Sequence, residues 1–209
     1  MKLISLLPNL INIGFNYVIQ TSEKYNIDES HSLRHSMEVY KFSKRILESE
    51  LSLKPFLEEQ KSIIFMSAIG HDMCDKKYMN EAEGIQNYKN YLSEYMSNTE
   101  LQVVGDIIST MSYSKVKANG YPDLGEYQLA YHIVREADLL GAYDFDRCVI
   151  YAMHHSKLNY NEAIKESLEL FDKRVLQMRK DNLFVTDFSK KESLSLHRKA
   201  VQEIKLNRI

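Results

Sequence analysis

The sequence is poor in the residues that make turns. Its 209 residues include only seven glycines and three prolines. Together they are about 5% of the chain, against a usual share of about 12%. This shortage excludes a turn-rich β-sandwich, a collagen-like repeat and a disordered tail protein. A chain with few turns must fold from long segments, so we expect an all-α protein.

Cysteine, net charge and long apolar runs are scarce as well. The two cysteines, Cys74 and Cys148, cannot form a disulfide framework, which favours a reducing, intracellular setting. The formal net charge of −2 gives no general attraction to nucleic acid or to acidic membranes. No stretch reaches the roughly 20 apolar residues of a membrane span. We therefore expect a cytoplasmic protein whose partners include neither a membrane nor nucleic acid.

The apolar start of the chain raises the question of a signal peptide. The run from Met1 to Leu7 stops at Pro8-Asn9, and no small-residue cleavage site follows. We interpret this segment as the beginning of a core helix.

Apolar residues at helical spacing recur from one end of the chain to the other. The spacing predicts helices over residues 10–19, 32–47, 55–70, 81–96, 101–111, 126–140, 145–155, 160–180 and 190–206. Thr99 and Gln102 have the spacing of a capping box at the start of the fifth helix. Because we find no repeat or linker, we predict one domain over residues 1–209, folded as a helical bundle.

Residues 112–125 hold the clearest turn chemistry, with Gly120, Pro122 and Gly125 close together. We interpret this stretch as one loop and expect it to be the moving part of the fold, because a loop of this length inside a compact domain is often functional. Its aromatic rings would stack on a base and its lysines would meet phosphates. The alternative, a solvated polar loop, stays open. The candidate substrate-binding residues here are Tyr113, Lys115, Lys117 and Tyr121.

The strongest chemical signal is His71-Asp72, which directly follows the apolar segment 63–70. Two ionisable residues beside an apolar helix are costly unless a partner such as a divalent metal compensates them. His35 and Asp138 lie in two other predicted helices, and a helical bundle can bring such positions to one point. Together these four residues would offer two nitrogens and two oxygens to one ion.

The order His35, His71-Asp72, Asp138 in an all-helical chain resembles the HD-domain superfamily of metal-dependent phosphohydrolases. The likeness extends to the small stand-alone HD hydrolases that include nucleotide pyrophosphohydrolases. In those proteins a Ser-His element precedes the first histidine, Asp-Lys follows the His-Asp pair, and a Thr with a basic helix closes the chain. The matching residues here are Ser30-His31, Asp75-Lys76 and Thr186 with the helix after it, so the resemblance covers about residues 28–204.

The resemblance implies a set of roles. His35, His71, Asp72 and Asp138 would hold one divalent ion, and the mixed donor set favours Mn²⁺, with Mg²⁺, Fe²⁺, Co²⁺ and Ni²⁺ left open. Asp75 would orient or deprotonate the attacking water. Lys76 would meet phosphate charge, Lys77 would bind substrate, and His31 would give a hydrogen bond or a proton to the leaving oxygen. For both lysines, a solvated loop stays open as the alternative.

Two departures from the family pattern concern the substrate rather than the metal. Glu38 stands where the family commonly has Arg, and Leu139 and Gly141 replace the Arg and the second Asp of the last motif. By contrast, Glu136, Cys148 and His132 are expected to have structural roles.

The sequence therefore predicts a phosphohydrolase acting on a small nucleotide. Release of pyrophosphate from a nucleoside triphosphate is the first expectation. Removal of phosphate from a monophosphate and cleavage of a cyclic or alarmone nucleotide are the alternatives. A non-catalytic binding domain that keeps the fold is the alternative from another class. Tyr-rich helix surfaces make a homodimer a reasonable expectation.

Overall fold

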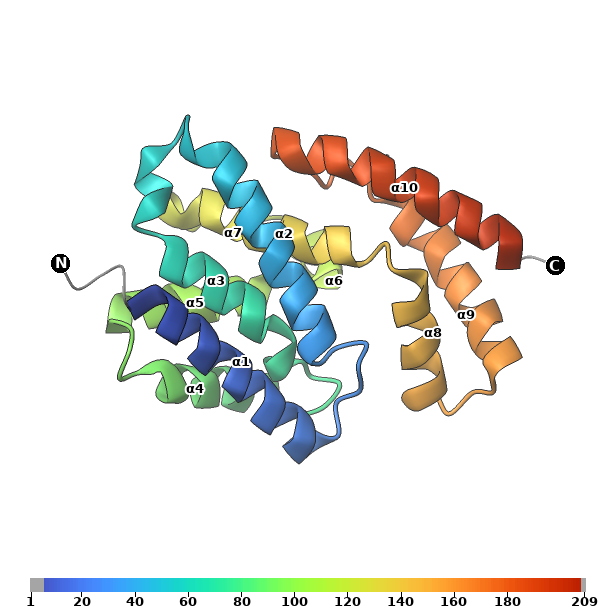
Figure 1. Cartoon of the computed structure of the whole chain (residues 1–209), viewed down its shortest axis with the longest axis horizontal. Helices are drawn as coiled ribbons and strands as arrows, with labels where there is room; N and C mark the ends of the chain where they lie inside the picture. The colour runs from blue at the N-terminus through green and yellow to red at the C-terminus, as the bar shows by residue number, and fades with distance from the viewer. Residues whose placement is uncertain (1–5, 208–209) are drawn as a thin grey trace.

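The computed structural model describes residues 6–207, and in these residues it contains helices and no strand (Figure 1). This confirms the predicted all-α class; residues 1–5 of the apolar start lie outside the described residues. The α-helices are α1 Leu6–Tyr25, α2 Leu33–Leu51, α3 Lys61–Gly70, α4 Glu81–Leu92, α5 Asn98–Thr110, α6 Tyr113–Asn119, α7 Gln128–Gly141, α8 Phe145–His154, α9 Tyr160–Lys173 and α10 Asp187–Asn207. Short 3₁₀ helices are η1 Pro55–Glu58, η2 His71–Cys74, η3 Gly125–Tyr127 and η4 Val175–Gln177.

Helix α3 is the centre of the core. Every residue from Ile63 to Gly70 is buried, and α3 packs against α1, α2, α5 and α7. Its last residue, Gly70, lies against the ring of Tyr88, where an added Cβ would be only 2.2 Å from a ring carbon. The Tyr88 hydroxyl donates a hydrogen bond of 2.9 Å to the Met66 carbonyl. This contact fixes the point at which α3 becomes η2, and thus the place of the residues that follow.

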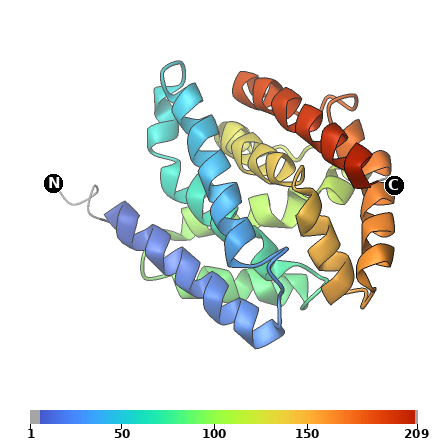
Figure 2. The same ribbon diagram turned by 45° about the vertical axis from the view of Figure 1, so that its right-hand side comes forward.

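The elements form two groups joined by α2 and α7, as Figure 1 shows. Helices α1, α3, α4 and α5 lie on one side of these two helices, and α8, α9 and α10 lie on the other. The same separation is clear from the second direction in Figure 2, where the described ends of the chain again lie on opposite sides. Helix α2 packs most extensively against α7, and α8 against α9.

Glu136 on α7 fixes α10 to this frame. Its buried carboxylate accepts hydrogen bonds from the Thr186 hydroxyl at 2.6 Å and from the Thr186 backbone N–H at 3.2 Å, and another from the Val185 N–H. Thr186 directly precedes α10. The structural role expected for Glu136 is confirmed.

Several helix boundaries differ from the prediction. The expected helix 55–70 is split into η1 and α3, and the expected helix 81–96 ends at Leu92, after which Tyr95 N–H turns back to the Leu92 carbonyl. The expected helix 160–180 ends at Lys173, because Arg174 leaves the helical region with φ −130° and ψ −64°. Each break occurs where side-chain spacing alone continues to look helical.

The predicted capping box was wrong by two residues. The Ser97 hydroxyl accepts from the Glu100 N–H, and the Glu100 carboxylate accepts from the Ser97 N–H at 2.8 Å, so α5 begins at Asn98. Both Ser97 and Thr99 are suitable caps by residue type, and the register of the apolar face decided between them.

The prediction of one loop over residues 112–125 was also wrong. Ser112 caps a short helix, α6, by accepting from the Lys115 N–H, and Val116 is buried beneath it. Gly120, at φ +76°, ends this helix, and Gly125, at φ +54°, begins η3. The Asn119-Gly120 pair is therefore a helix C-terminus, a position that favours glycine because of its positive φ.

None of the helices within residues 6–207 combines the length and apolar character needed to cross a membrane.

Candidate metal centre and cavity

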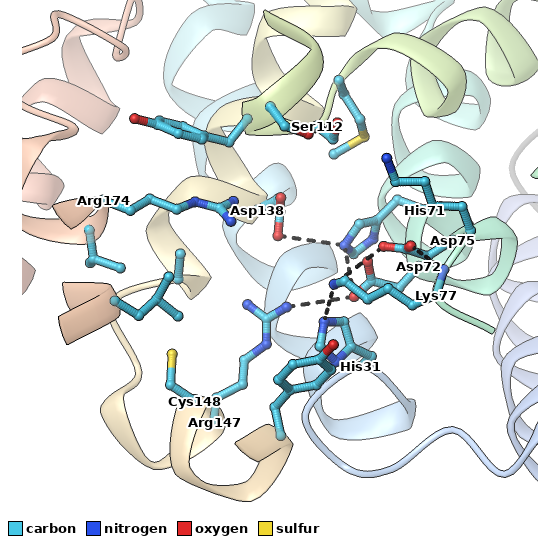
Figure 3. Close-up of a pocket in the computed structure, with 18 of the residues that line it drawn as sticks. His31, His71, Asp72, Asp75, Lys77, Ser112, Asp138, Arg147, Cys148 and Arg174 are labelled. Carbon is cyan, nitrogen blue, oxygen red and sulfur yellow. Dashed lines mark hydrogen bonds and ion pairs between the residues drawn. The ribbon is translucent and has the colours of Figure 1, made fainter. Parts of the chain in front are cut away.

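The four predicted metal ligands come together in the structure, and Figure 3 shows three of them, His71, Asp72 and Asp138. His35 projects from α2, His71 and Asp72 from η2, and Asp138 from α7. Nε2 of His35 lies 3.3 Å from Nε2 of His71, 3.4 Å from Oδ2 of Asp72 and 3.3 Å from Oδ1 of Asp138. Nε2 of His71 lies 3.4 Å from the same Asp72 oxygen and 3.6 Å from the same Asp138 oxygen. Residues distant in the sequence thus point two nitrogens and two oxygens at one spot.

The backbone of α3 orients His71. Its Nδ1 lies 2.9 Å from the Ala68 carbonyl, which can only accept, so Nδ1 carries the proton and Nε2 faces the cluster. A backbone carbonyl on the far nitrogen is the usual way in which proteins set the tautomer of a metal-binding histidine.

Burial and the neighbouring charges set the protonation states of these groups, and His71 must lose a proton when it binds a metal ion. Burial, together with the nearby Arg147 charge, lowers the pKa of His35 to about 4, so its imidazole is neutral. Burial alone would lower the pKa of His71, but the carboxylates of Asp72 and Asp138 outweigh it and raise the pKa to about 9. Burial would raise the pKa of both carboxyls, yet the neighbouring histidines hold each below its ordinary value. Both carboxylates are ionised at neutral pH.

The arrangement fits a divalent metal ion. His35, His71 and Asp138 offer ligand atoms that all lie within 4.8 Å of one another, and Asp72 adds a carboxylate oxygen at similar distance from both imidazoles. Oδ2 of Asp72 is buried and makes no hydrogen bond. Buried carboxylate oxygens that converge with imidazole nitrogens favour a cation between them. Imidazole nitrogen with carboxylate oxygen suits a first-row transition ion.

A cavity of about 530 Å³ opens over the cluster, with walls from η2, α6, α8 and α9. Apolar wall residues include Ile108, Met111, Leu170 and Val175. In the part of the chain that the structure describes, six cationic and six carboxylate side chains line this cavity. The cationic ones are Lys76, Lys77, Lys115, Arg147, Lys173 and Arg174, and the carboxylates are Asp72, Asp75, Glu81, Asp138, Glu166 and Glu169.

The predicted catalytic residues His31, Asp75 and Lys76 all line the cavity. Two of them, Asp75 and His31, both contact Lys77. Asp75 accepts from the Lys77 backbone at 2.9 Å and pairs with the Lys77 ammonium at 3.4 Å. The Lys77 ammonium also donates to Nε2 of His31 at 3.1 Å, so the proton of His31 lies on Nδ1, 2.6 Å from the Ser30 hydroxyl. Burial lowers the pKa of His31 to about 2. His31 is therefore neutral, which favours a hydrogen-bonding role over proton donation; Lys76 has no ion pair with a described residue.

The predicted substrate-binding residues are divided. Tyr113 and Lys115 line the cavity, although Lys115 already pairs with Glu81 and donates to the Ser109 carbonyl at 2.6 Å. Lys117 and Tyr121 do not line it. The ring of Tyr121 instead packs against the ring of His132 on α7, with 5.0 Å between the ring centres, because the chain turns away from the cavity after α6.

Sequence reasoning missed the two arginines of the wall. Nη2 of Arg147 on α8 lies 3.6 Å from Oδ2 of Asp72, and its Nε donates to the Ser30 carbonyl. Arg174, at the end of α9, points toward Asp138 (Figure 3), with its guanidinium 4.6 Å from the centre of the Tyr113 ring. Its Nε is buried without a hydrogen-bond partner. The one available signal was that Arg147 and Tyr151 share a helix face directly after the motif that contains Asp138.

Cys148 and His132 have the structural character expected of them, and His154 takes part in an ion pair away from the cluster. Burial raises the pKa of the Cys148 thiol to about 11, which does not suit a nucleophile. Nε2 of His132 lies 3.2 Å from the Gln128 amide nitrogen, outside the cavity. Nδ1 of His154 pairs with Asp28 at 3.4 Å.

Comparison with known proteins found no match for this chain among protein-family models, curated proteins or solved structures.

Proposed function

We propose that this protein is a metal-dependent phosphohydrolase that acts on a small nucleotide. The observation that carries the proposal is the convergence of His35, His71, Asp72 and Asp138 beneath a cavity with two arginines in its wall. A cation-binding cluster beside guanidinium groups is a combination suited to a phosphate ester, since both stabilise charge on phosphoryl oxygens.

The resemblance to the HD superfamily supports this proposal through the order and identity of the same four residues. Its departures do not remove a side chain from the cavity: Leu139 is 2% exposed within the core, and neither it nor Gly141 lines the cavity. This favours an enzyme over a binding domain that has lost its catalytic activity.

Each residue of the proposed site has a role that agrees with its position. His35, His71, Asp72 and Asp138 would hold the ion, which when bound supplies a Lewis acid and lowers the pKa of water. Arg147 binds a phosphoryl oxygen beside Asp72, and its guanidinium stabilises the charge that grows there. Asp75 accepts a proton from the attacking water. The neutral His31 keeps the Lys77 ammonium in place at 3.1 Å, and Lys76 and Arg174 attract the anionic substrate.

The charge of the cavity favours a monophosphate over the triphosphate expected first. Its six cationic side chains are balanced by six carboxylates, so a divalent ion leaves an excess of two positive charges. A phosphate monoester dianion neutralises that excess, whereas a triphosphate would bring about two further negative charges. Lys115 and Lys173 are already paired with Glu81 and Glu169.

Product analysis tests the proposal. The purified chain, loaded with Mn²⁺, is given nucleoside mono-, di- and triphosphates and cyclic nucleotides, and phosphate and pyrophosphate are measured separately. We expect phosphate from monophosphates and loss of turnover in Asp72→Ala, with Asp187→Ala, an exposed change at the start of α10, as the control.

Two results would contradict parts of this proposal. Retained metal and undiminished turnover in Asp72→Ala would remove the site assignment. Pyrophosphate as the product would mean that the substrate is a nucleoside triphosphate, as the sequence first predicts. Bound metal with no turnover of any phosphate compound would favour the binding domain.

A further inference from the structure

A second, much smaller hollow lies against His35. Its volume of about 10 Å³ is close to the 10–15 Å³ that one water molecule needs. Five charged side chains surround it together with His35 and Ile150: Glu29, Arg34, Glu38, Asp144 and Arg147. The hollow is therefore polar, and its volume is at the lower limit for a single water.

His35 needs a hydrogen-bond acceptor on this side. Its Nε2 faces His71 and the two carboxylates, and when this nitrogen holds a metal ion the proton of the neutral ring lies on Nδ1. His35 is 1% exposed, and no protein group accepts from Nδ1. A buried N–H without an acceptor is costly, and metal-binding histidines usually donate this proton to a carboxylate, a carbonyl or a water.

Glu38 is the carboxylate that remains available in the hollow. Asp144 is committed, since one oxygen pairs with Arg34 at 3.3 Å and the other caps α8 by accepting from the Arg147 N–H at 3.3 Å. Glu29 is exposed. Glu38 is half-buried, one turn after His35 on α2, and among the described residues it has neither an ion pair nor a side-chain hydrogen bond that would occupy it.

The side chains of His35 and Glu38 both approach Gly141. A Cβ at this position would lie 3.6 Å from Nδ1 of His35 and 3.6 Å from Oε2 of Glu38. Nδ1 of His35 and Oε2 of Glu38 therefore lie close to one point beside residue 141, which has no side chain. Two of the positions that depart from the HD pattern, 38 and 141, are neighbours in space.

We propose that Glu38 is a positioning residue for the metal centre. Its carboxylate receives the Nδ1–H of His35 through one water in the hollow, and this fixes the ring with Nε2 toward the metal. The inference rests on the proposed function, because it requires a metal ion at the cluster.

The test measures metal affinity and the histidine tautomer rather than turnover alone. Native protein, Glu38→Ala and Glu38→Gln are titrated with Mn²⁺ by calorimetry. The control is Glu48→Ala, a change of an exposed residue on the same helix that pairs only with Lys44 at 3.8 Å. Long-range ¹H–¹⁵N spectra of the Zn²⁺-loaded proteins report which nitrogen of His35 carries the proton, and thermal melting without metal reports the fold.

We expect Glu38→Ala to bind Mn²⁺ about 10- to 100-fold more weakly. Glu38→Gln, whose amide oxygen still accepts from a water, should recover most of that affinity, and the His35 Nδ1–H signal should broaden only in the alanine variant. Native affinity in Glu38→Ala, or an equal loss in Glu38→Ala and Glu38→Gln, would overturn the inference while leaving the metal centre in place. Failure of the native protein to bind Mn²⁺ would instead overturn the proposed function.

Discussion

The floor and the wall of the cavity differ in how firmly they are held. The floor residues His71 and Asp72, and His35 in contact with them beneath the cavity, are buried and come from elements packed around the core. The wall carries long cationic side chains from α8 and α9, and one of them, Lys173, has a side chain that is 75% exposed. Changes in the floor should therefore act on metal affinity, and changes in the wall on substrate binding and turnover.

The largest effect should come from removing a floor ligand. His71→Gln takes away one imidazole of the cluster and leaves the two carboxylates without it, so Mn²⁺ affinity should fall by more than about 100-fold. The metal content after dialysis and the calorimetric Kd measure this. His197→Gln, on α10, is the control and should bind as the native protein does. Equal metal content in His71→Gln and native protein would mean that the ion binds elsewhere.

A change in the wall should separate turnover from metal binding. Arg147→Lys keeps the charge but loses the planar fork that lies 3.6 Å from Asp72. We expect kcat/KM to fall about 100-fold, with no loss of Mn²⁺ affinity. The matched change is Arg45→Lys, at an exposed arginine that pairs with Glu192. Weaker metal binding in Arg147→Lys with normal turnover of the loaded protein would reverse the distinction between floor and wall.

Gly141→Ala tests how tightly the floor is packed. The new Cβ would lie 3.3 Å from Cε1 of His35, so the ring must shift. We expect the free energy of unfolding to fall by about 1–3 kcal/mol, and Mn²⁺ binding to weaken about 10-fold.

Gly120→Ala separates these two effects, because its Cβ would meet no atom within 4 Å but its φ is +76°. It should cost about 1–3 kcal/mol of stability through backbone strain and leave Mn²⁺ affinity unchanged. Chemical denaturation and calorimetry measure the pair. Metal affinity lost equally in both variants would mean that general destabilisation, rather than the His35 contact, is responsible.

The smallest effect should come from the aromatic residues of the wall. Tyr113→Ala removes the ring beneath Arg174, a contact worth about 1 kcal/mol, and KM should rise about fivefold. Tyr121→Ala should leave KM unchanged, because Tyr121 lies against α7 and not in the cavity. Steady-state kinetics on both variants decide the matter, and an increase in KM for Tyr121→Ala alone would restore the sequence-based expectation.

The sequence was sufficient to predict which residues form the candidate metal cluster, and the reason is physical. His71 and Asp72 stand out beside a helix that is otherwise apolar, and Asp138 interrupts another apolar helix. The free-energy cost of burying these ionisable residues can therefore be recognised from the sequence alone. Arg147 and Arg174 carry no such mark, since arginines on amphipathic helices are ordinary. Their role depends on how α8 packs against α9 and on the break of the helix at Arg174, neither of which side-chain spacing encodes.

The errors in helix boundaries have a similar origin. Ser97 and Thr99 both satisfy the chemistry of a helix start, and only the packing of α5 selects Ser97. The segment after Ser112 was interpreted as a loop because of its glycines, but those glycines mark the end of α6 and the start of η3. Turn residues locate ends of elements, and they do not show whether a short helix lies between them.

The contact between Gly70 and Tyr88 has a consequence for recognising distant relatives. An added Cβ at position 70 would be 2.2 Å from the Tyr88 ring, so the two positions must vary together. We expect relatives with Ala or Ser at the position before the His-Asp pair to carry a smaller residue at the position of Tyr88. This paired constraint links α3 to α4 and reports on how the chain enters η2. It therefore offers a signature of descent that is independent of the short His-Asp motif itself.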